Sequence, residues 1–324
     1  MVVARARRRT MRGMGSIPAG AAAGRQVGID LGGTSIKAGV VTDSGAVVTE
    51  DNFDPGFARG PQAVLDTLAD IFKRLGGGEQ LGIGVPGLLD RARGHLIASP
   101  NLPGFVDLGV KHELARRVGL PPERVHVEND ANAAAVGELW LGAGRGTRDA
   151  LLVTLGTGIG GGLILNGELY AGSGMAGEVG HVVVDPHGPP CGCGKRGCVE
   201  TLASATAARR RALAAQLPPD KPGDLPTLTA RARSGSLAEL SLLREIGRDL
   251  GRGLGPVVCL LDLSTFVFGG GFSAALDLLE PGIREGLDER SYSGRGPHVR
   301  LLQATLGPSA GWIGAARVAL LAHR

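Results

Sequence analysis

The sequence predicts an α/β fold of two similar domains with a cleft between them, and three observations support this. The chain has 324 residues, enough for a sizeable core and two domains. Predicted strands and helices alternate along it. A strand–glycine turn–strand unit occurs twice, at residues 27–41 and 150–165, which indicates two related domains whose interface would bind a ligand. We expect a disordered basic tail at 1–24, an N-terminal domain at 25–128 that the closing helix 310–322 completes, and a C-terminal domain at 129–309.

Glycine, proline and the hydrophobic pattern give the bounds of each element. Residues 27–30 are apolar and end at a glycine turn, which is typical of a buried strand. Residues 61–75 begin with a proline and end at three glycines, the usual start and stop of a helix. The other strands are predicted at 38–41, 46–49, 81–85, 125–128, 150–155, 162–165, 266–268 and 299–302, and the other helices at 111–118, 130–141, 199–215, 236–262, 273–280 and 310–322.

The net charge of +4 belongs to the N-terminal tail. Residues 1–14 contain five arginines and no acidic residue, and without those five charges the rest of the chain carries −1. The body therefore does not resemble a nucleic-acid-binding surface. The tail lacks the apolar stretch of a secretory signal, and no apolar run reaches the ~18 residues of a membrane span. We expect a cytoplasmic protein with no nucleic-acid or membrane partner, and the alternative is a basic arm that touches one of them.

Two glycine-rich turns are candidates for binding phosphate. The first glycine hairpin is DLGGTSIK at residues 30–37, and the second is LGTGIGGG at residues 155–162. Glycines allow backbone N–H groups to approach phosphate oxygens, a threonine adds a hydroxyl donor, and Asp30 could hold Mg²⁺ through water. One such turn alone is more often an ordinary hairpin. Two of them facing across a cleft would bind a polyphosphate from both sides.

The segment ENDANAAA at residues 128–135 lies where a predicted strand runs into a helix. Asn129 would cap the helix and Asp130 would favour its positive end, and this structural role is enough to explain both residues. In the functional interpretation, Asp130 is the general base for a hydroxyl group. A helix N-terminus lowers the pKa of a carboxylate and weakens it as a base. Phosphoryl transfer tolerates a weak base because its transition state is loose.

Three of the four cysteines lie within eight residues, at Cys191, Cys193 and Cys198. In a chain without an export signal, such a cluster indicates a metal site and not disulfides. Together with His181 the cysteines form a closed Cys₃His set, the composition of a structural zinc site. The fourth, Cys259, lies in an apolar run and is expected to be buried in the core.

Other polar residues lie beside these segments. Glu178 and Glu200 flank the cysteine cluster, where they are either solvated or suited to sugar hydroxyls. Asn101 begins an Asn-Leu-Pro-Gly run, which is usually a turn. Near a cleft, its amide could contact a hydroxyl group.

These segments together resemble the ROK family, which comprises bacterial sugar kinases and related repressors. The matching stretches are DLGGTSIK, LGTGIGGG, ENDANAAA, EVGH and CGCGKRGCVE, and their order and spacing agree with the family from about residue 25 to 320. The family belongs to the superfamily of hexokinases, actin and heat-shock ATPases. The resemblance therefore implies two ribonuclease-H-like (actin/hexokinase-type) domains that close over a sugar, and a zinc-stapled loop.

The resemblance also implies an activity: ATP-dependent phosphorylation of a hexose 6-hydroxyl, with glucose as the first choice of sugar and Asp130 as the catalytic base. Its cofactors would be ATP, Mg²⁺ and structural Zn²⁺, and the protein would be a homodimer or homotetramer. The implied sugar-binding residues are Asn101, Asn129, Asp130, Glu178, His181 and Glu200. The implied nucleotide-binding residues are Asp30, Gly32, Gly33, Thr34, Lys37, Thr157, Gly158, Gly270 and Gly271, and the zinc ligands are His181, Cys191, Cys193 and Cys198.

Three alternatives remain within the family. A repressor would carry a winged helix-turn-helix domain before the kinase-like body, and the residues before the first hairpin are too few for one. A kinase could act on N-acetylglucosamine, N-acetylmannosamine, mannose or fructose. A polyphosphate-driven glucokinase would lack the cysteine-rich stretch. Phe105 stands where family glucokinases often have Trp, which weakens the choice of sugar and leaves the reaction unchanged.

Overall fold

Two five-stranded mixed sheets organise the chain. The computed structural model describes residues 24–99, 101–102, 104–292 and 298–322, so nearly all of the predicted basic tail lies outside the described residues. The first sheet has the strand order β3-β2-β1-β4-β8. Its strands are β1 (Arg25–Leu31), β2 (Ile36–Thr42), β3 (Val47–Phe53), β4 (Leu81–Val85) and β8 (Val125–Asn129). In this sheet β1, β2 and β3 pair antiparallel, whereas β1, β4 and β8 pair parallel.

The second sheet repeats this order and these directions. It runs β11-β10-β9-β12-β13, antiparallel from β9 to β11 and parallel from β9 to β13. Its strands are β9 (Ala150–Leu155), β10 (Ile159–Leu165), β11 (Glu168–Tyr170), β12 (Thr265–Gly269) and β13 (Arg300–Gln303). The repeat found in the sequence therefore corresponds to the hairpins β1–β2 and β9–β10. A small antiparallel sheet that the sequence did not predict contains β5 (Leu88–Asp90), β6 (His95–Ala98) and β7 (Val106–Leu108).

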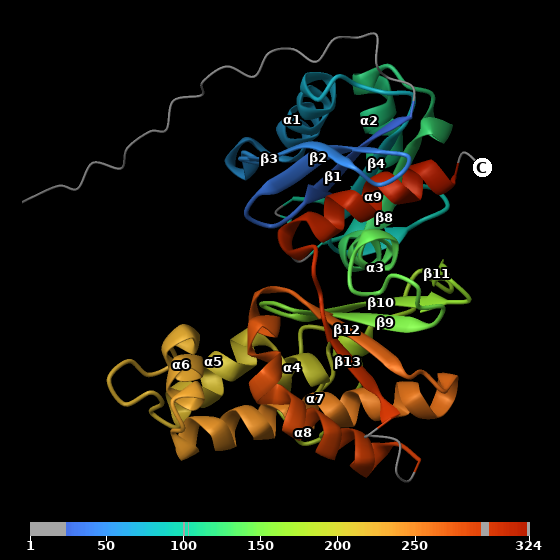
Figure 1. Cartoon of the computed structure of the whole chain (residues 1–324). Helices are drawn as coiled ribbons and strands as arrows, with labels where there is room; N and C mark the ends of the chain where they lie inside the picture. The colour runs from blue at the N-terminus through green and yellow to red at the C-terminus, as the bar shows by residue number, and fades with distance from the viewer. Residues whose placement is uncertain (1–23, 100, 103, 293–297, 323–324) are drawn as a thin grey trace, which may run out of the picture.

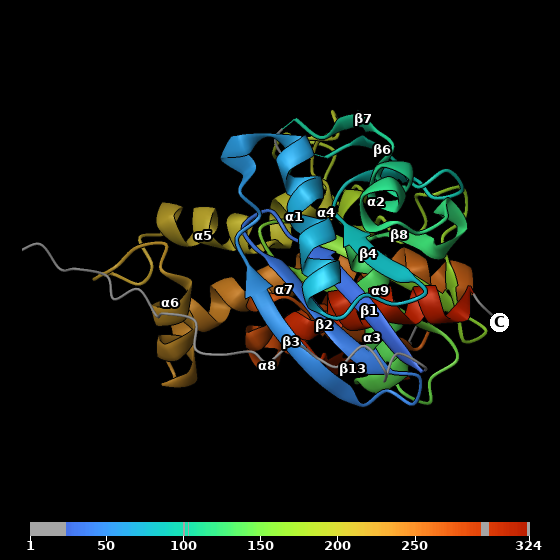
Figure 2. The same cartoon turned by 90° about the horizontal axis from the view of Figure 1, so that it is seen from above.

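Helices cover both faces of each sheet (Figures 1 and 2). The helices α1 (Pro61–Arg74) and α2 (Val110–Val118) share a hydrophobic core with the first sheet. The other face of that sheet packs on α9 (Ala310–Leu321), so closely that a Cβ atom at Gly82 would lie 1.9 Å from the carbonyl oxygen of Ala315. The helix α3 (Asp130–Leu141) lies between α9 and the strands β9 and β10 (Figure 1). The two sheets are thus joined through a pair of helices.

The second sheet shares its largest core with the C-terminal helices, in which α7 and α8 pack along each other (Figure 1). The helix predicted at 199–215 breaks at Ser204, because the Ser204 hydroxyl caps a new helix by accepting the N–H of Ala207 at 3.1 Å. A further helix, α6, lies within the predicted break 217–236. The helices are α4 (Val199–Ala203), α5 (Ala205–Ala214), α6 (Leu225–Arg233), α7 (Leu237–Leu261) and α8 (Leu276–Arg290). Within the described residues, no helix combines the length and apolar character that a membrane span requires.

The expectation that Cys259 is buried is wrong, since this thiol is exposed. The core-facing stripe of α7 runs through Leu250, Leu254 and Val258, at the helical spacing of four residues. Cys259 lies one position, or about 100°, away from that stripe. Apolar sequence around it therefore did not mean burial.

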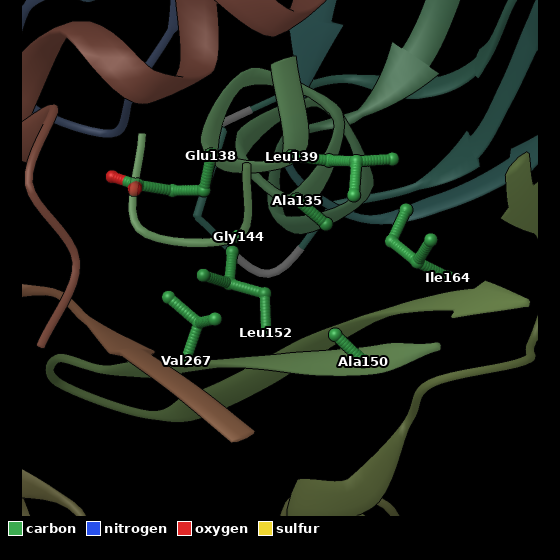
Figure 3. A pocket seen from close by; sticks show the side chains of 8 residues that line it. All are labelled: Ala135, Glu138, Leu139, Gly144, Ala150, Leu152, Ile164 and Val267. Atoms are coloured by element: carbon green, nitrogen blue, oxygen red, sulfur yellow. The ribbon is translucent and has the colours of Figure 1, made fainter. Parts of the chain in front are cut away.

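A buried carboxylate ties α3 to both chain segments that connect the sheets. Glu138, which is 1% exposed, accepts the backbone N–H groups of Ala143 at 2.8 Å, Thr305 at 3.2 Å and Leu306 at 2.8 Å. Ala143 follows α3 on the way to β9, and residues 305–306 lie between β13 and α9. Figure 3 shows a small apolar pocket between α3 and the second sheet, and both Glu138 and Leu152 line it. Glu138 therefore fixes the layer where the two halves meet.

Candidate active site

Asp30 and Asp130 lie at the same edge of the first sheet. The strands β1, β4 and β8 are parallel, Asp30 is paired in register with Gly84, and Gly84 with Glu128, two residues before Asp130. A Cβ atom at Gly84 would lie 3.7 Å from Oδ1 of Asp30 and 3.6 Å from Cα of Asp130. The two acids therefore flank Gly84 where the carboxyl ends of parallel strands meet.

Both carboxyl groups have raised pKa values. Burial, followed by the charge of Asp130, raises the pKa of Asp30 to about 7, and Lys37 on the adjacent strand opposes this. Burial also raises the pKa of Asp130; the backbone N–H groups of Ala131 and Asp130 lower it by less, and Glu178 adds to the rise. The expectation that the helix N-terminus would weaken Asp130 as a base is wrong, because desolvation of the charged form is the larger effect. A raised pKa makes Asp130 a better proton acceptor.

Asn129 caps α3, as the sequence predicted. Its side-chain oxygen accepts the N–H groups of Ala131 at 2.9 Å and Asn132 at 3.2 Å. Its side-chain nitrogen donates to the carbonyl oxygen of Gly87 at 3.3 Å. The amide oxygen is thus engaged in the cap, and one N–H of the side chain is left for another partner.

An ion pair between the buried Glu128 and the exposed Arg91 supports this strand–helix junction, and no sequence pattern predicted it. Glu128 is 1% exposed and accepts Nε of Arg91 at 2.7 Å. It also accepts the side-chain nitrogen of Asn132 and the backbone N–H of Asn129, both at 3.0 Å. An acidic residue at the end of an apolar strand pointed to a partner, but Arg91 is 37 residues away in the sequence.

The first glycine hairpin borders the segment that contains Asn101. The turn is closed by the N–H of Gly32, which donates to the carbonyl oxygen of Ser35 at 3.0 Å. Gly33 and Thr34 are exposed, as a phosphate-binding turn requires. A Cβ atom at Gly33 would lie 3.2 Å from the backbone oxygen of Asn101. The structure therefore brings Asn101 to the hairpin, and Lys37 lies opposite Asp30 on β2.

The second glycine hairpin adjoins the turn that follows β12. The N–H of Gly156 donates to the carbonyl oxygen of Gly158 at 3.0 Å, and Thr157 between them is exposed. Gly270 has φ 82°, and a Cβ atom there would lie 2.5 Å from the carbonyl oxygen of Leu155. Gly271 faces open space. These predicted nucleotide residues are thus brought together, and Gly270 is required both by its backbone conformation and by this close approach.

The four predicted zinc ligands converge. One donor atom from each of His181, Cys191, Cys193 and Cys198 lies within 4.8 Å of all the others. Nδ1 of His181 lies 3.6 Å from Sγ of Cys191, and the sulfur atoms of Cys193 and Cys198 are 3.6 Å apart. Tetrahedral zinc with ordinary bond lengths separates its ligand atoms by about 3.5–3.8 Å. The donor set therefore fits zinc, with Nδ1 of His181 on the metal side and Nε2 left for another partner.

The Cys198 thiol resists ionisation beside the other cysteines. Burial, with hydrogen bonds from Cys193 and Cys191, raises the pKa of the Cys198 thiol to about 12. A bound zinc ion deprotonates its cysteine ligands. The same four residues would then hold the ion in a closed structural site.

The two flanking glutamates differ in their surroundings. Glu178 is exposed, precedes the short helix η4 (Val179–His181), and contributes to the raised pKa of Asp130. Glu200 has a partner that the sequence did not predict, because its Oε2 accepts the backbone N–H of Ile159 at 3.0 Å. Phe105 is buried in the first core, and its ring lies edge-on to that of Phe57 with ring centroids 6.5 Å apart.

A cavity of about 810 Å³ lies among β5, β8, the loop 172–175 and the end of α9. It is lined by residues such as Leu88, His126 and Met175, and none of the predicted site residues contributes to it. The predicted catalytic, nucleotide-binding and metal-binding residues therefore lie outside this cavity.

Comparison with known proteins agrees with the arrangement of these segments. The family model described as ROK family matches residues 26–322. A glucokinase of Thermotoga maritima is 35% identical over 308 residues, which cover 90% of this chain and 96% of the relative. The N-acetylmannosamine kinase of Salmonella typhi is 31% identical, covering 90% of this chain and 97% of the relative.

A solved structure extends the similarity to three dimensions. The ROK family glucokinase from Streptomyces griseus, solved in complex with glucose and AMPPNP, is 35% identical and superposes with a TM-score of 0.77, covering 92% of this chain and all of that one. The family match spans both sheets, both glycine hairpins and the cysteine cluster. The chain belongs to the ROK family.

Proposed function

We propose that this protein is an ATP-dependent glucokinase, which transfers the γ-phosphoryl group of ATP to the 6-hydroxyl of glucose. The observation that carries the proposal is the half-buried pair Asp30 and Asp130, on either side of Gly84 at one sheet edge. In this proposal one carboxylate would hold the metal-bound nucleotide and the other would receive a proton. A site for phosphoryl transfer needs these two functions close together.

In the proposed reaction, Asp130 orients the sugar hydroxyl and accepts its proton as the oxygen bonds to the γ-phosphorus and the bond to the β-phosphate oxygen breaks. Mg²⁺ bound with ATP would offset the charge on the phosphates, and Asp30 would hold it through water. Exposed Thr34 and Thr157 would donate to the phosphates together with backbone N–H groups of the two hairpins. Gly270 and Gly271 would lie beside the adenosine.

The same proposal covers the architecture. The two sheets with their helices would form two ribonuclease-H-like domains, at 25–128 with 310–322 and at 129–309, which close over the sugar. Their equal strand order supports this. A homodimer or homotetramer in the cytoplasm remains our expectation.

Glucose is the proposed sugar because the glucokinases of Thermotoga maritima and Streptomyces griseus are 35% identical, the second solved with glucose, whereas the N-acetylmannosamine kinase of Salmonella typhi is 31% identical. Nδ2 of Asn129, which has one N–H beyond its bond to Gly87, and Nε2 of His181 would contact hydroxyl groups. Asn101, Glu178 and Glu200 would complete the set.

A coupled ADP-release assay with ATP over six hexoses, repeated with polyphosphate as donor, tests the proposal. We expect the highest kcat/KM with glucose and ATP, and glucose 6-phosphate as the product by NMR. A higher kcat/KM for an N-acetylated hexosamine than for glucose would contradict the choice of glucose and leave the kinase assignment unchanged. Absence of phosphoryl transfer to every hexose, in a protein with full zinc occupancy, would reject the kinase assignment.

A further inference from the structure

The segment that carries the predicted zinc ligands also holds the second glycine hairpin. Glu200 is the second residue of α4 and follows Cys198 by two positions. Its Oε2 accepts the N–H of Ile159, the first residue of β10 after the turn, at 3.0 Å. A Cβ atom at Gly158 would lie 2.2 Å from the same oxygen. Only glycine at position 158 leaves the carboxylate in this place.

Two more contacts join the same parts of the chain. The N–H of Ala205, just after α4, donates to the carbonyl oxygen of Gly156 at 2.9 Å. Gly180, which lies between Glu178 and His181, packs so closely that a Cβ atom there would lie 2.0 Å from the carbonyl oxygen of Ile159. The predicted zinc-binding segment therefore contacts the second hairpin on both sides of the cysteine cluster, through Gly180 before it and through Glu200 after it.

Backbone bonds also join those two ends to each other. The N–H of Val184 donates to the carbonyl oxygen of Gly197 at 2.8 Å, and that of Val199 donates to the carbonyl oxygen of Val182 at 2.9 Å. Metal ligation by His181 and Cys198 would lock this short pairing, since these two ligands adjoin it. A change at the metal would consequently move Glu200 and Gly180 together.

We propose that Glu200 is a positioning residue for the nucleotide, which holds the second glycine hairpin in its phosphate-binding shape, and that the zinc-bound segment fixes Glu200 for this purpose. The inference rests on the proposed function and goes beyond it, because the family resemblance gives Glu200 and the metal to the sugar side. A carboxylate repels phosphate, so Glu200 acts through the N–H of Ile159 and the backbone that follows Gly158. Without that acceptor, the turn loses the contact that fixes its exit into β10.

The test measures binding of Mg·AMPPNP by calorimetry without sugar, so that a role in sugar binding alone does not change the result. Loss of one hydrogen bond to a charged acceptor is worth about 1.5 kcal/mol or more, so we expect Glu200→Ala to weaken nucleotide binding about tenfold. Glu200→Gln keeps an oxygen acceptor and should stay within about twofold of the wild type. The control is Lys195→Ala, an exposed side chain between the cysteines, which should leave nucleotide affinity unchanged.

A second pair of variants tests the contact itself. Gly158→Ala places a methyl group where Oε2 of Glu200 lies, and should weaken nucleotide binding in the wild-type background. In the Glu200→Ala background the same change should cost much less, because the two residues are coupled. Additive effects of the two changes would contradict the contact. This pair also decides the question if Glu200→Ala lowers the melting temperature.

Zinc removal completes the experiment. The chelated protein should bind Mg·AMPPNP more weakly than the zinc-loaded protein, and readdition of zinc should restore the affinity. Wild-type nucleotide affinity in Glu200→Ala together with weakened glucose binding would overturn the inference and leave the kinase assignment intact. A zinc-loaded wild type that binds no nucleotide would instead reject the proposed function.

Discussion

The two glycine hairpins occupy equivalent places in equivalent sheets, yet different chemistry surrounds them. The first follows β1, whose last two residues are Asp30 and Leu31. The pKa of Asp30 is raised to about 7, and its neighbours Lys37 and Asp130 are acidic or basic. The second follows β9, whose last two residues are Thr154 and Leu155, so an uncharged threonine stands where the first hairpin has Asp30. It is bonded to Glu200 and Ala205, which belong to the cysteine-rich segment and its continuation. The first hairpin thus lies among ionisable side chains, and the second is held by the segment that carries the predicted zinc ligands. We infer that the first hairpin supplies titratable chemistry and the second supplies geometry.

The largest effect is expected from a variant that removes the proposed proton acceptor and keeps the shape of the site. Asp130→Asn preserves the size of the side chain but cannot accept a proton, and a general base contributes roughly 10²–10⁴-fold to the rate. We expect kcat to fall by that factor, while the melting temperature and nucleotide affinity stay close to wild type. Steady-state kinetics with calorimetry on the same preparation measures all three. Retention of more than a tenth of kcat would show that Asp130 is not the general base.

The second largest effect is expected from a variant that removes the predicted metal site and keeps Asp30 and Asp130. Cys193→Ser should lose zinc and disorder the loop that carries His181, and misplacement of a binding group by about 1 Å can cost about 10²-fold in kcat/KM. Nucleotide affinity should fall as well, through Glu200. Metal analysis and titrations with glucose and Mg·AMPPNP measure the losses.

Cys259 provides the matched control. Its thiol is exposed on α7 and lies outside the four-residue cluster, so Cys259→Ser should keep full zinc occupancy and wild-type kinetics. Full zinc occupancy in Cys193→Ser would instead contradict the assignment of the ligands.

The same contrast shows what sequence can predict. The helix 130–141 and the strands 81–85 and 150–155 were predicted at their observed bounds, because each follows from a local pattern of turns and apolar residues. The convergence of His181 with the three cysteines followed from residue type and spacing. The bond from Ile159 to Glu200 spans 41 residues, and that from Leu306 to Glu138 spans 168. No local pattern encodes such pairs.

Two predictions from local sequence were wrong, one about the pKa of Asp130 and one about the burial of Cys259. A helix N-terminus should lower the pKa of Asp130, but desolvation raises it. The apolar run around Cys259 suggested core, but the helix turns this residue to the solvent. Both errors arise because the surroundings of a side chain depend on tertiary packing. The division into two domains and the roles of the sugar-binding residues stay predictions.

The third effect concerns the layer that joins the two halves. Glu138→Gln replaces one carboxylate oxygen by an NH₂ group that cannot accept a backbone N–H, and leaving such a buried donor unsatisfied costs about 1–3 kcal/mol. We expect the free energy of unfolding to fall by about 2 kcal/mol. Denaturant unfolding measures this, and Glu123→Gln, at an exposed position, is the control. Equal stability of the two variants would mean that Glu138 does not hold the connecting segments.

The smallest effect is a pH dependence that belongs to the first hairpin alone. Only the ionised form of Asp30 can hold Mg²⁺ through water, and with a pKa of about 7 its ionised fraction rises from about a tenth at pH 6 to about nine tenths at pH 8. Affinity for Mg·AMPPNP should therefore rise about tenfold over this range, with the weaker binding on the acid side. Asp30→Asn is the control, because it removes this carboxyl group and keeps the titration of the nucleotide.

The two hairpins can then be separated in one set of titrations. Asp30→Asn should flatten the pH profile of nucleotide binding and leave its dependence on zinc. Glu200→Ala should lower the affinity at every pH and leave the slope, because Glu200 acts on the shape of the second hairpin and not on the charge of the first. If the wild-type and Asp30→Asn profiles run parallel from pH 6 to 8, Asp30 does not hold the metal. If Glu200→Ala also flattens the profile, the two hairpins act as one unit, and the contrast between a titratable half and a metal-held half does not hold.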